Sequence, residues 1–213
     1  MATAKQYSRK EIHIDTSQLD TLTKELKGFE KEVAVATYHA LNRTIDRVIT
    51  QTTKLIRQHY AIKDKVKDIK GTFRGGIKRP TKTDLTASLT SRGYTLSFAH
   101  FPFTPKKRLK KQKPVKVQII KTKSPITSKR GFVAHTGAKS ADKIQYNVFK
   151  RLGKERKPIA PIRTLSIPQM ISSEKISEEI QDFATKEFNK RLEHEITREI
   201  LNIGKNVKRR AIL

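Results

Sequence analysis

The stretch FEKEVAVATYHALNRTIDRVITQTTKLIRQHY, residues 29–60, has the clearest periodicity in the chain. Apolar or small side chains recur along it every three or four residues, at Val33, Thr37, Leu41, Ile45, Val48, Thr52 and Leu55, and His59 continues the spacing. This spacing places them on one face of an α-helix, because a helical turn takes about 3.6 residues. The stretch therefore predicts a long amphipathic helix whose buried face includes Leu41, Ile45 and Val48.

A second helical pattern runs from Ser173 to about Asn202. Ser173 suits the N-cap position, and Glu174 in the first turn suits the positive end of the helix dipole. Gly204 suits the C-terminal cap. The apolar positions predict one buried stripe, made of Ile176, Ile180, Ala184, Phe188, Leu192, Ile196 and Ile200.

Between the two long helices the period of the apolar residues changes from about four to two, which indicates strands. The alternating segments are 85–89, 94–98, 115–119, 132–135 and 144–152, with a turn signal at Arg92-Gly93. Shorter helices are predicted at 17–28 and 62–71. These elements predict an α+β fold in which a twisted, mostly antiparallel sheet packs against a long N-terminal helix and a long C-terminal helix.

The same pattern divides the chain into three parts. Residues 1–28 form an N-terminal arm or short helix, residues 29–204 form one α+β domain, and residues 205–213 form a basic C-terminal tail. A chain of 213 residues is of the size expected for one domain with arms.

The composition is strongly basic. Lys and Arg number 47 against 20 Asp and Glu, which gives a formal net charge of +27. A compact monomer with this charge repels itself, so an anionic partner is expected: nucleic acid, an acidic protein surface or a membrane. No apolar run approaches the length of a membrane span, which argues against the membrane. Cysteine is absent, which excludes disulfides, thiolate metal sites and cysteine nucleophiles.

The positive charge is concentrated in the strand region. Thirteen Lys or Arg and no acid lie between Asp84 and Asp142, whereas residues 174–199 hold eight acids and five Lys or Arg. Six cations in eight residues form one candidate site for DNA, another anion or a protein partner: Lys106, Lys107, Arg108, Lys110, Lys111 and Lys113. Such a loop binds phosphates as point charges, without sequence specificity; the alternative is a solvated surface loop.

A second candidate contact is the expected hairpin tip around Gly153, where four cations could meet a partner: Lys150, Arg151, Lys154 and Arg156.

Signatures of catalysis are missing from the sequence. It contains neither of the glycine-rich phosphate-binding motifs, G-x-x-x-x-G-K-[ST] and G-x-G-x-x-G, and no H-E-x-x-H zinc motif. Its six histidines lack the spacing of metal ligands. Asp64 and Asp68 lie one helical turn apart, but lysines stand between them, as on an ordinary charged helix face. We therefore expect no enzyme, no metal, no cofactor and no small-molecule substrate.

Two segments together carry a family resemblance. The first is FKRLGKERKPIAPIRTLSIPQMI, residues 149–171, whose prolines exclude a helix interior or a central strand. The second is Ala40-Leu41-Asn42-Arg43-Thr44 in the predicted long helix. With the order of elements over roughly residues 30–200, these segments resemble the minor tail protein Z family of tailed phages and prophages. The chain departs from that pattern by its extension at 1–28 and by a longer lysine loop at 106–113.

The resemblance implies a structural virion protein at the head-proximal end of a phage tail. It implies that the protein completes the tail and helps join it to the head around the DNA channel, as a homo-oligomeric ring. Expected partners are other tail or head–tail connector proteins and, by charge, the packaged DNA; assembly takes place in the host cytoplasm. The alternative is a sequence-independent nucleic-acid-binding protein of ribosomal or nucleoid type. A toxin or nuclease is a weaker rival, because it needs a carboxylate or histidine cluster.

Overall fold

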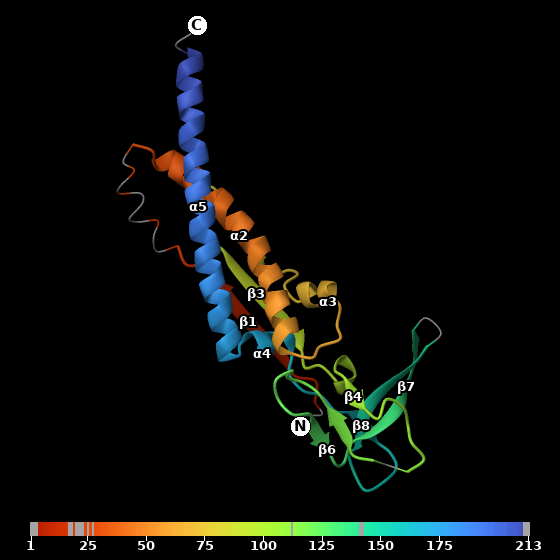
Figure 1. The fold of residues 1–213 in the computed structure, drawn as a ribbon. Helices are drawn as coiled ribbons and strands as arrows, with labels where there is room; N and C mark the ends of the chain where they lie inside the picture. Colours follow the sequence, from red (N-terminus) through yellow and green to blue (C-terminus); the bar gives the residue numbers. More distant parts are fainter. Residues whose placement is uncertain are drawn as a thin grey trace. The chain divides into compact units, whose positions relative to one another are not determined.

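The computed structural model describes residues 4–16, 19, 24, 26, 28–111, 113–140 and 143–210. It has the predicted α+β content, with two long helices and three small antiparallel sheets (Figure 1). The short helix predicted at 17–28 falls largely outside the described residues. The chain forms two compact units, each assembled from three segments. We name them the helical unit (11–52, 73–91 and 174–213) and the hairpin unit (1–10, 53–72 and 92–173).

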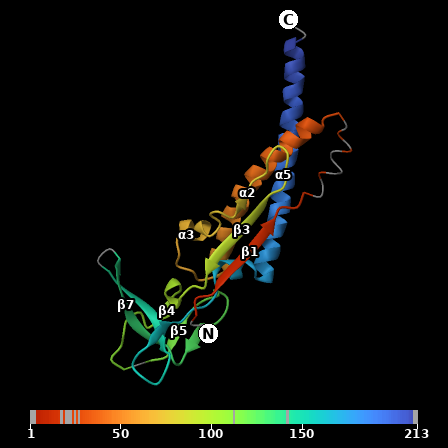
Figure 2. The same cartoon turned by 180° about the vertical axis from the view of Figure 1, so that it is seen from behind.

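The helical unit contains most of α2 (Glu30–His59) and all of α5 (Glu174–Arg210). Its sheet has the strand order β1-β3-β2, formed by β1 (Tyr7–His13), β2 (Ile77–Lys78) and β3 (Ser88–Tyr94), and parts of β1 and β3 belong to the hairpin unit. Figures 1 and 2 show α2 and α5 side by side, with β1 and β3 on one side of the helix pair. The unit therefore has a layer of helices over a small sheet.

The predicted core of α2 is confirmed, because Leu41, Ile45 and Val48 are completely buried. The predicted stripe of α5 is confirmed only as far as Leu192. Beyond it, Ile196 is half-buried and Ile200 is 45% exposed. The predicted end of α5 is wrong, because the helix continues through Gly204 to Arg210. A glycine inside a helix costs only about 1 kcal/mol relative to alanine, so the helix formers around it prevail.

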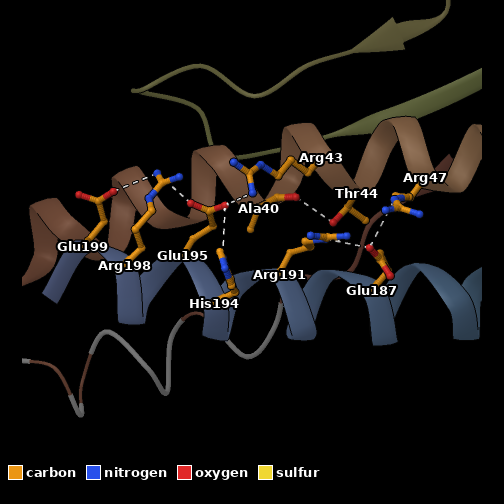
Figure 3. Close-up of polar contacts among 10 residues, drawn as sticks. All are labelled: Ala40, Arg43, Thr44, Arg47, Glu187, Arg191, His194, Glu195, Arg198 and Glu199. Atoms are coloured by element: carbon orange, nitrogen blue, oxygen red, sulfur yellow. Dashed lines mark hydrogen bonds and ion pairs between the residues drawn. The ribbon is translucent and has the colours of Figure 1, made fainter. Parts of the chain in front are cut away.

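The segment Ala40-Leu41-Asn42-Arg43-Thr44 lies where α2 faces α5 (Figure 3). The Thr44 hydroxyl donates to the Ala40 carbonyl at 2.8 Å, and both residues are completely buried. The Arg43 guanidinium Nη1 lies 2.7 Å from Oε1 of Glu195. Arg198 Nη2 lies 2.8 Å from Oε2 of the same carboxylate, and the side chain of Glu195 is completely buried. The segment therefore joins α2 to α5 by packing and by an ion-pair cluster.

The hairpin unit holds two further sheets and the short helices. One sheet has the order β4-β5-β6, from β4 (Phe103–Thr104), β5 (Val115–Val117) and β6 (Ile126–Ser128). The other has the order β7-β8-β9, from β7 (Phe132–Ser140), β8 (Lys143–Arg151) and β9 (Ile159–Pro161). The helix predicted within 62–71 is α3 (Val66–Gly71).

The strands predicted at 85–89 and 94–98 are placed wrongly. The structure has one strand over Ser88–Tyr94 and a 3-10 helix, η1, over Phe98–His100. The turn signal Arg92-Gly93 lies inside the strand, because non-local hydrogen bonds hold it extended. The Arg92 N–H donates to the Thr72 carbonyl at 2.8 Å, and the Gly93 carbonyl accepts from the Ser8 hydroxyl at 3.4 Å.

The proline-rich segment 149–171 becomes an edge strand followed by one capped turn of helix. Strand β9 pairs with β8, with Arg151 opposite Ile159. Helix α4 (Ile167–Ile171) begins after Ser166, whose hydroxyl accepts from the Gln169 N–H at 3.2 Å. Proline is tolerated at a sheet edge and in the first turn of a helix, where its missing N–H costs no hydrogen bond.

Candidate anion-binding cleft

The loop that holds the six cations of residues 106–113, named the basic loop, and the hairpin tip around Gly153 border the same cleft in the hairpin unit. The loop runs from the end of β4 to the start of β5, and Figures 1 and 2 show β4 beside the β7–β8 hairpin. The cleft has a volume of about 300 Å³. Its lining consists of Pro105, Arg108, Leu109, Lys110, Lys113, Phe132, Val133, Ala134, Arg151, Arg156, Lys157 and Ile159. We name it the basic cleft.

The basic cleft unites part of each candidate site. From the loop it takes Arg108, Lys110 and Lys113, and from the hairpin tip Arg151 and Arg156. The remaining candidates do not line it: Lys106, Lys107, Lys111, Lys150 and Lys154. These residues are exposed apart from Lys150, which is half-buried. They can therefore meet a partner only outside the basic cleft.

Strand pairing positions the hairpin side of the basic cleft. Phe132 of β7 lies opposite Phe149 of β8, and the chain returns from β8 to β9 through residues 152–158. The Arg151 guanidinium lies 5.5 Å from the centre of the Phe132 ring, a cation–π distance. Its Nη1 also donates to the backbone carbonyl of Glu155 at 3.5 Å. Two contacts thus orient one cation of the basic cleft.

Acidic groups do not balance this charge within the lining. Of the twelve described residues that line it, six are cationic and none is acidic. Residues 143–157 contain one acid, Glu155, and it is the backbone carbonyl of this residue that accepts from Arg151. Burial, and then the charge of the loop residue Lys106, lower the pKa of Lys63. A carboxylate or a phosphate that enters the basic cleft meets positive charge that no acid among the described lining residues balances.

The other half of the lining is apolar, which the charge pattern alone does not predict. Leu109 is 42% exposed and Ile159 is 39% exposed, whereas Val133 is nearly buried. Lys157 was also missed as a site residue, although the run of cations before Pro158 could have indicated it. The basic cleft therefore combines a cationic rim with an exposed aliphatic surface.

The two carboxylates at α3, Asp68 within the helix and Asp64 just before it, have partners in the structure. Asp64 Oδ1 lies 2.6 Å from His100 Nδ1, and Asp68 Oδ2 accepts from the Lys65 N–H at 3.2 Å. Among the described residues no cluster of histidine and carboxylate side chains is suited to hold a metal ion. No helix formed by the described residues is long and apolar enough to span a bilayer.

Comparison with known proteins identifies a family. A sequence model of a family described as prophage minor tail protein Z matches residues 17–205, most of the chain. Neither a curated protein nor a solved structure matches. The matched range includes both segments on which the resemblance rests, 40–44 and 149–171, and the residues that line the basic cleft.

Proposed function

The chain belongs to the prophage minor tail protein Z family, and from that premise we propose that it acts at the head-proximal end of a phage tail. As a member of this family it is a structural protein of a phage tail and a component of the virion. In the proposed function it completes the tail and helps join it to the head. It does so as a ring around the DNA channel, in contact with other tail or connector proteins.

The basic cleft and the cations around it are the observation that supports this proposal. A chain with a net charge of +27 gains from neighbours that neutralise it, and a head–tail junction offers two such neighbours, DNA and acidic subunits. Loop cations outside the basic cleft, such as Lys106, Lys107 and Lys111, are exposed and suit a sequence-independent contact with phosphates. The nucleoid-type alternative also accounts for the positive charge, but it does not account for the family match.

The test replaces the six loop cations by glutamine and supplies this variant to a phage that lacks the protein. We expect tails and DNA-filled heads to accumulate unjoined and the titre of infectious particles to fall. A second variant controls for the loss of net charge by carrying six exposed lysines changed to glutamine elsewhere: Lys31, Lys54, Lys67, Lys82, Lys175 and Lys186.

Two results would contradict the proposed function. If the loop variant supports normal joining and DNA retention, the loop is a solvated surface. If cryo-electron microscopy of intact particles places the protein at the end of the tail remote from the head, the proposed position is wrong. The same map gives the number of subunits in the ring and shows whether the loop reaches DNA.

A further inference from the structure

The lining of the basic cleft sets two requirements for an occupant. Six lining residues are cationic, so an occupant with negative charge gains electrostatic energy. Six are apolar, and two of these, Leu109 and Ile159, are exposed to about two fifths of their maximum. An occupant that covers them with apolar atoms gains hydrophobic energy as well. The best occupant is therefore anionic at its edges and apolar at its centre.

Nucleic acid meets only the first requirement. A phosphate–sugar backbone gains affinity mainly by charge neutralisation, which needs no apolar surface. Single-stranded bases do bind apolar surfaces, but they stack on aromatic rings. Among the described lining residues Phe132 is the one aromatic residue. Arg151 lies over its ring, and the centre of the Phe149 ring lies 6.4 Å from the centre of the Phe132 ring. The other apolar lining residues are aliphatic or proline, which offer no stacking platform.

We propose that the basic cleft binds an acidic segment of another protein, which packs an apolar side chain on Leu109 and Ile159. In this arrangement carboxylates flanking the apolar side chain bind Arg108 and Arg156, whose planar guanidinium groups match a carboxylate with two hydrogen bonds. A central apolar anchor surrounded by charged contacts is also the usual organisation of a binding hot spot. The volume of about 300 Å³ lies at the lower end for ligand sites, which suits a short segment.

This inference deepens the proposed function and rests on it only for the statement that the partner is a neighbouring subunit of the particle. The chemistry of the basic cleft is tested on the purified full-length chain, and particle assembly does not enter the measurement. Two fluorescent peptides serve as probes: one in which glutamates flank a single leucine, and one in which serine replaces that leucine. A DNA duplex and a single strand serve as competitors at physiological ionic strength.

We expect the leucine peptide to bind about tenfold more tightly than the serine peptide, because one buried aliphatic side chain supplies about that factor. The double variant Leu109→Ser, Ile159→Thr should lose this preference and keep its affinity for the serine peptide. Exposed apolar residues elsewhere give the matched control, Ile77→Thr with Leu201→Ser, which should keep the preference. Circular dichroism of each variant verifies the fold.

The charge requirement has its own pair of variants. Arg108→Gln with Arg156→Gln should lower the affinity for both peptides at least tenfold. Lys107→Gln with Lys154→Gln, in the same two loops but outside the lining, should change these affinities less than threefold. Equal affinity for the two peptides would overturn the inference. So would displacement of the leucine peptide by either DNA that persists when Lys106, Lys107 and Lys111 are changed to glutamine, because the basic cleft itself would then be a nucleic-acid site.

Failure of the inference and failure of the proposed function leave different results. If the chain does not prefer the leucine peptide while the loop variant still blocks head–tail joining, the proposed function stands with another anion as partner. If the peptides bind as expected while particles assemble normally, the basic cleft binds acidic protein but serves a role other than joining.

Discussion

The contact between α2 and α5 provides the sharpest test of the fold, through the substitution Arg43→Met. Methionine keeps most of the aliphatic stem of arginine and removes the charge. The buried Glu195 carboxylate then loses the guanidinium that lies 2.7 Å from Oε1 and keeps Arg198, which lies 2.8 Å from Oε2. Neither contact has the alignment of a hydrogen bond, so charge attraction is the main compensation for burying this carboxylate.

The expected cost follows from burial on one side and exposure on the other. A buried ion that loses its sole partner costs about 3–5 kcal/mol. Glu195 is completely buried but retains Arg198, and Arg43 itself is 46% exposed. The loss of Arg43 therefore resembles the loss of one hydrogen-bond partner of a buried acceptor more than the loss of a sole counter-ion. On that basis we expect Arg43→Met to lower the free energy of unfolding by about 1–3 kcal/mol.

Arg47→Met is the matched control, one helical turn further along α2. Arg47 Nε lies 4.0 Å from Oε1 of Glu187, its side chain is 63% exposed, and Glu187 keeps Arg191 at 2.9 Å (Figure 3). An exposed pair of this kind contributes about 0–1 kcal/mol.

Urea unfolding followed by far-UV circular dichroism measures both arginine variants. In the Glu195→Met background the cost of Arg43→Met should fall, because no buried charge is left unpaired; we expect a coupling energy of about 0.5–3 kcal/mol. If Arg43→Met costs no more than Arg47→Met, or if the two substitutions at Arg43 and Glu195 are additive, the ion-pair cluster does not hold α2 to α5.

Three further predictions concern the core, catalysis and pH. Leu41→Ala should cost about 2–5 kcal/mol in the same urea assay, since Leu41 is completely buried; an unchanged midpoint would remove it from the core. The purified chain should not hydrolyse nucleotides, DNA or peptidoglycan, and metal-dependent turnover that disappears with one acidic residue would contradict the structural role. The N–H of Gly28 donates to Glu30 at 3.0 Å and lowers the pKa of that carboxyl below 4.5, so NMR titration should give a midpoint below this value. Because the folded pKa is the lower one, the contribution of Glu30 to stability is present above pH 4.5 and is lost as the pH falls through the folded pKa; Glu30→Gln should remove this dependence.

The long helices were predictable because their apolar residues have a local period. The structure places α2 at Glu30–His59, within one residue at each end of the predicted 29–60. The prediction for α5 failed where an ion-pair cluster replaces apolar packing. Glu195 is buried and Ile200 is exposed. Apolar periodicity predicts the opposite, an exposed Glu195 and a buried Ile200. The sequence pattern contains no signal that Arg43, far away in the chain, faces Glu195.

The strands were less predictable because their positions depend on partners distant in sequence. Alternation indicated β5 and β8, but Arg92-Gly93 resembles a turn and is held extended by partners distant in sequence, such as Thr72 and Ser8. The basic cleft illustrates the same limit. Both groups of cations were visible in the sequence, whereas their shared border depends on the fold of the hairpin unit.

The prolines of segment 149–171 explain why a partner should bind beside β9 rather than along it. Strand β9 is the edge of its sheet and spans only Ile159–Pro161. Along a strand the N–H groups alternate in direction, and the Ile162 N–H donates to Val148 of β8, so the N–H of Ala160 also points to β8. Pro158 and Pro161 have no N–H, so within this edge only Ile159 can donate to an added strand. Binding by strand addition draws its affinity from a row of such donors, which this edge lacks. The side chains of the adjoining basic cleft, Ile159 among them, are therefore the recognition surface that this part of the sheet offers.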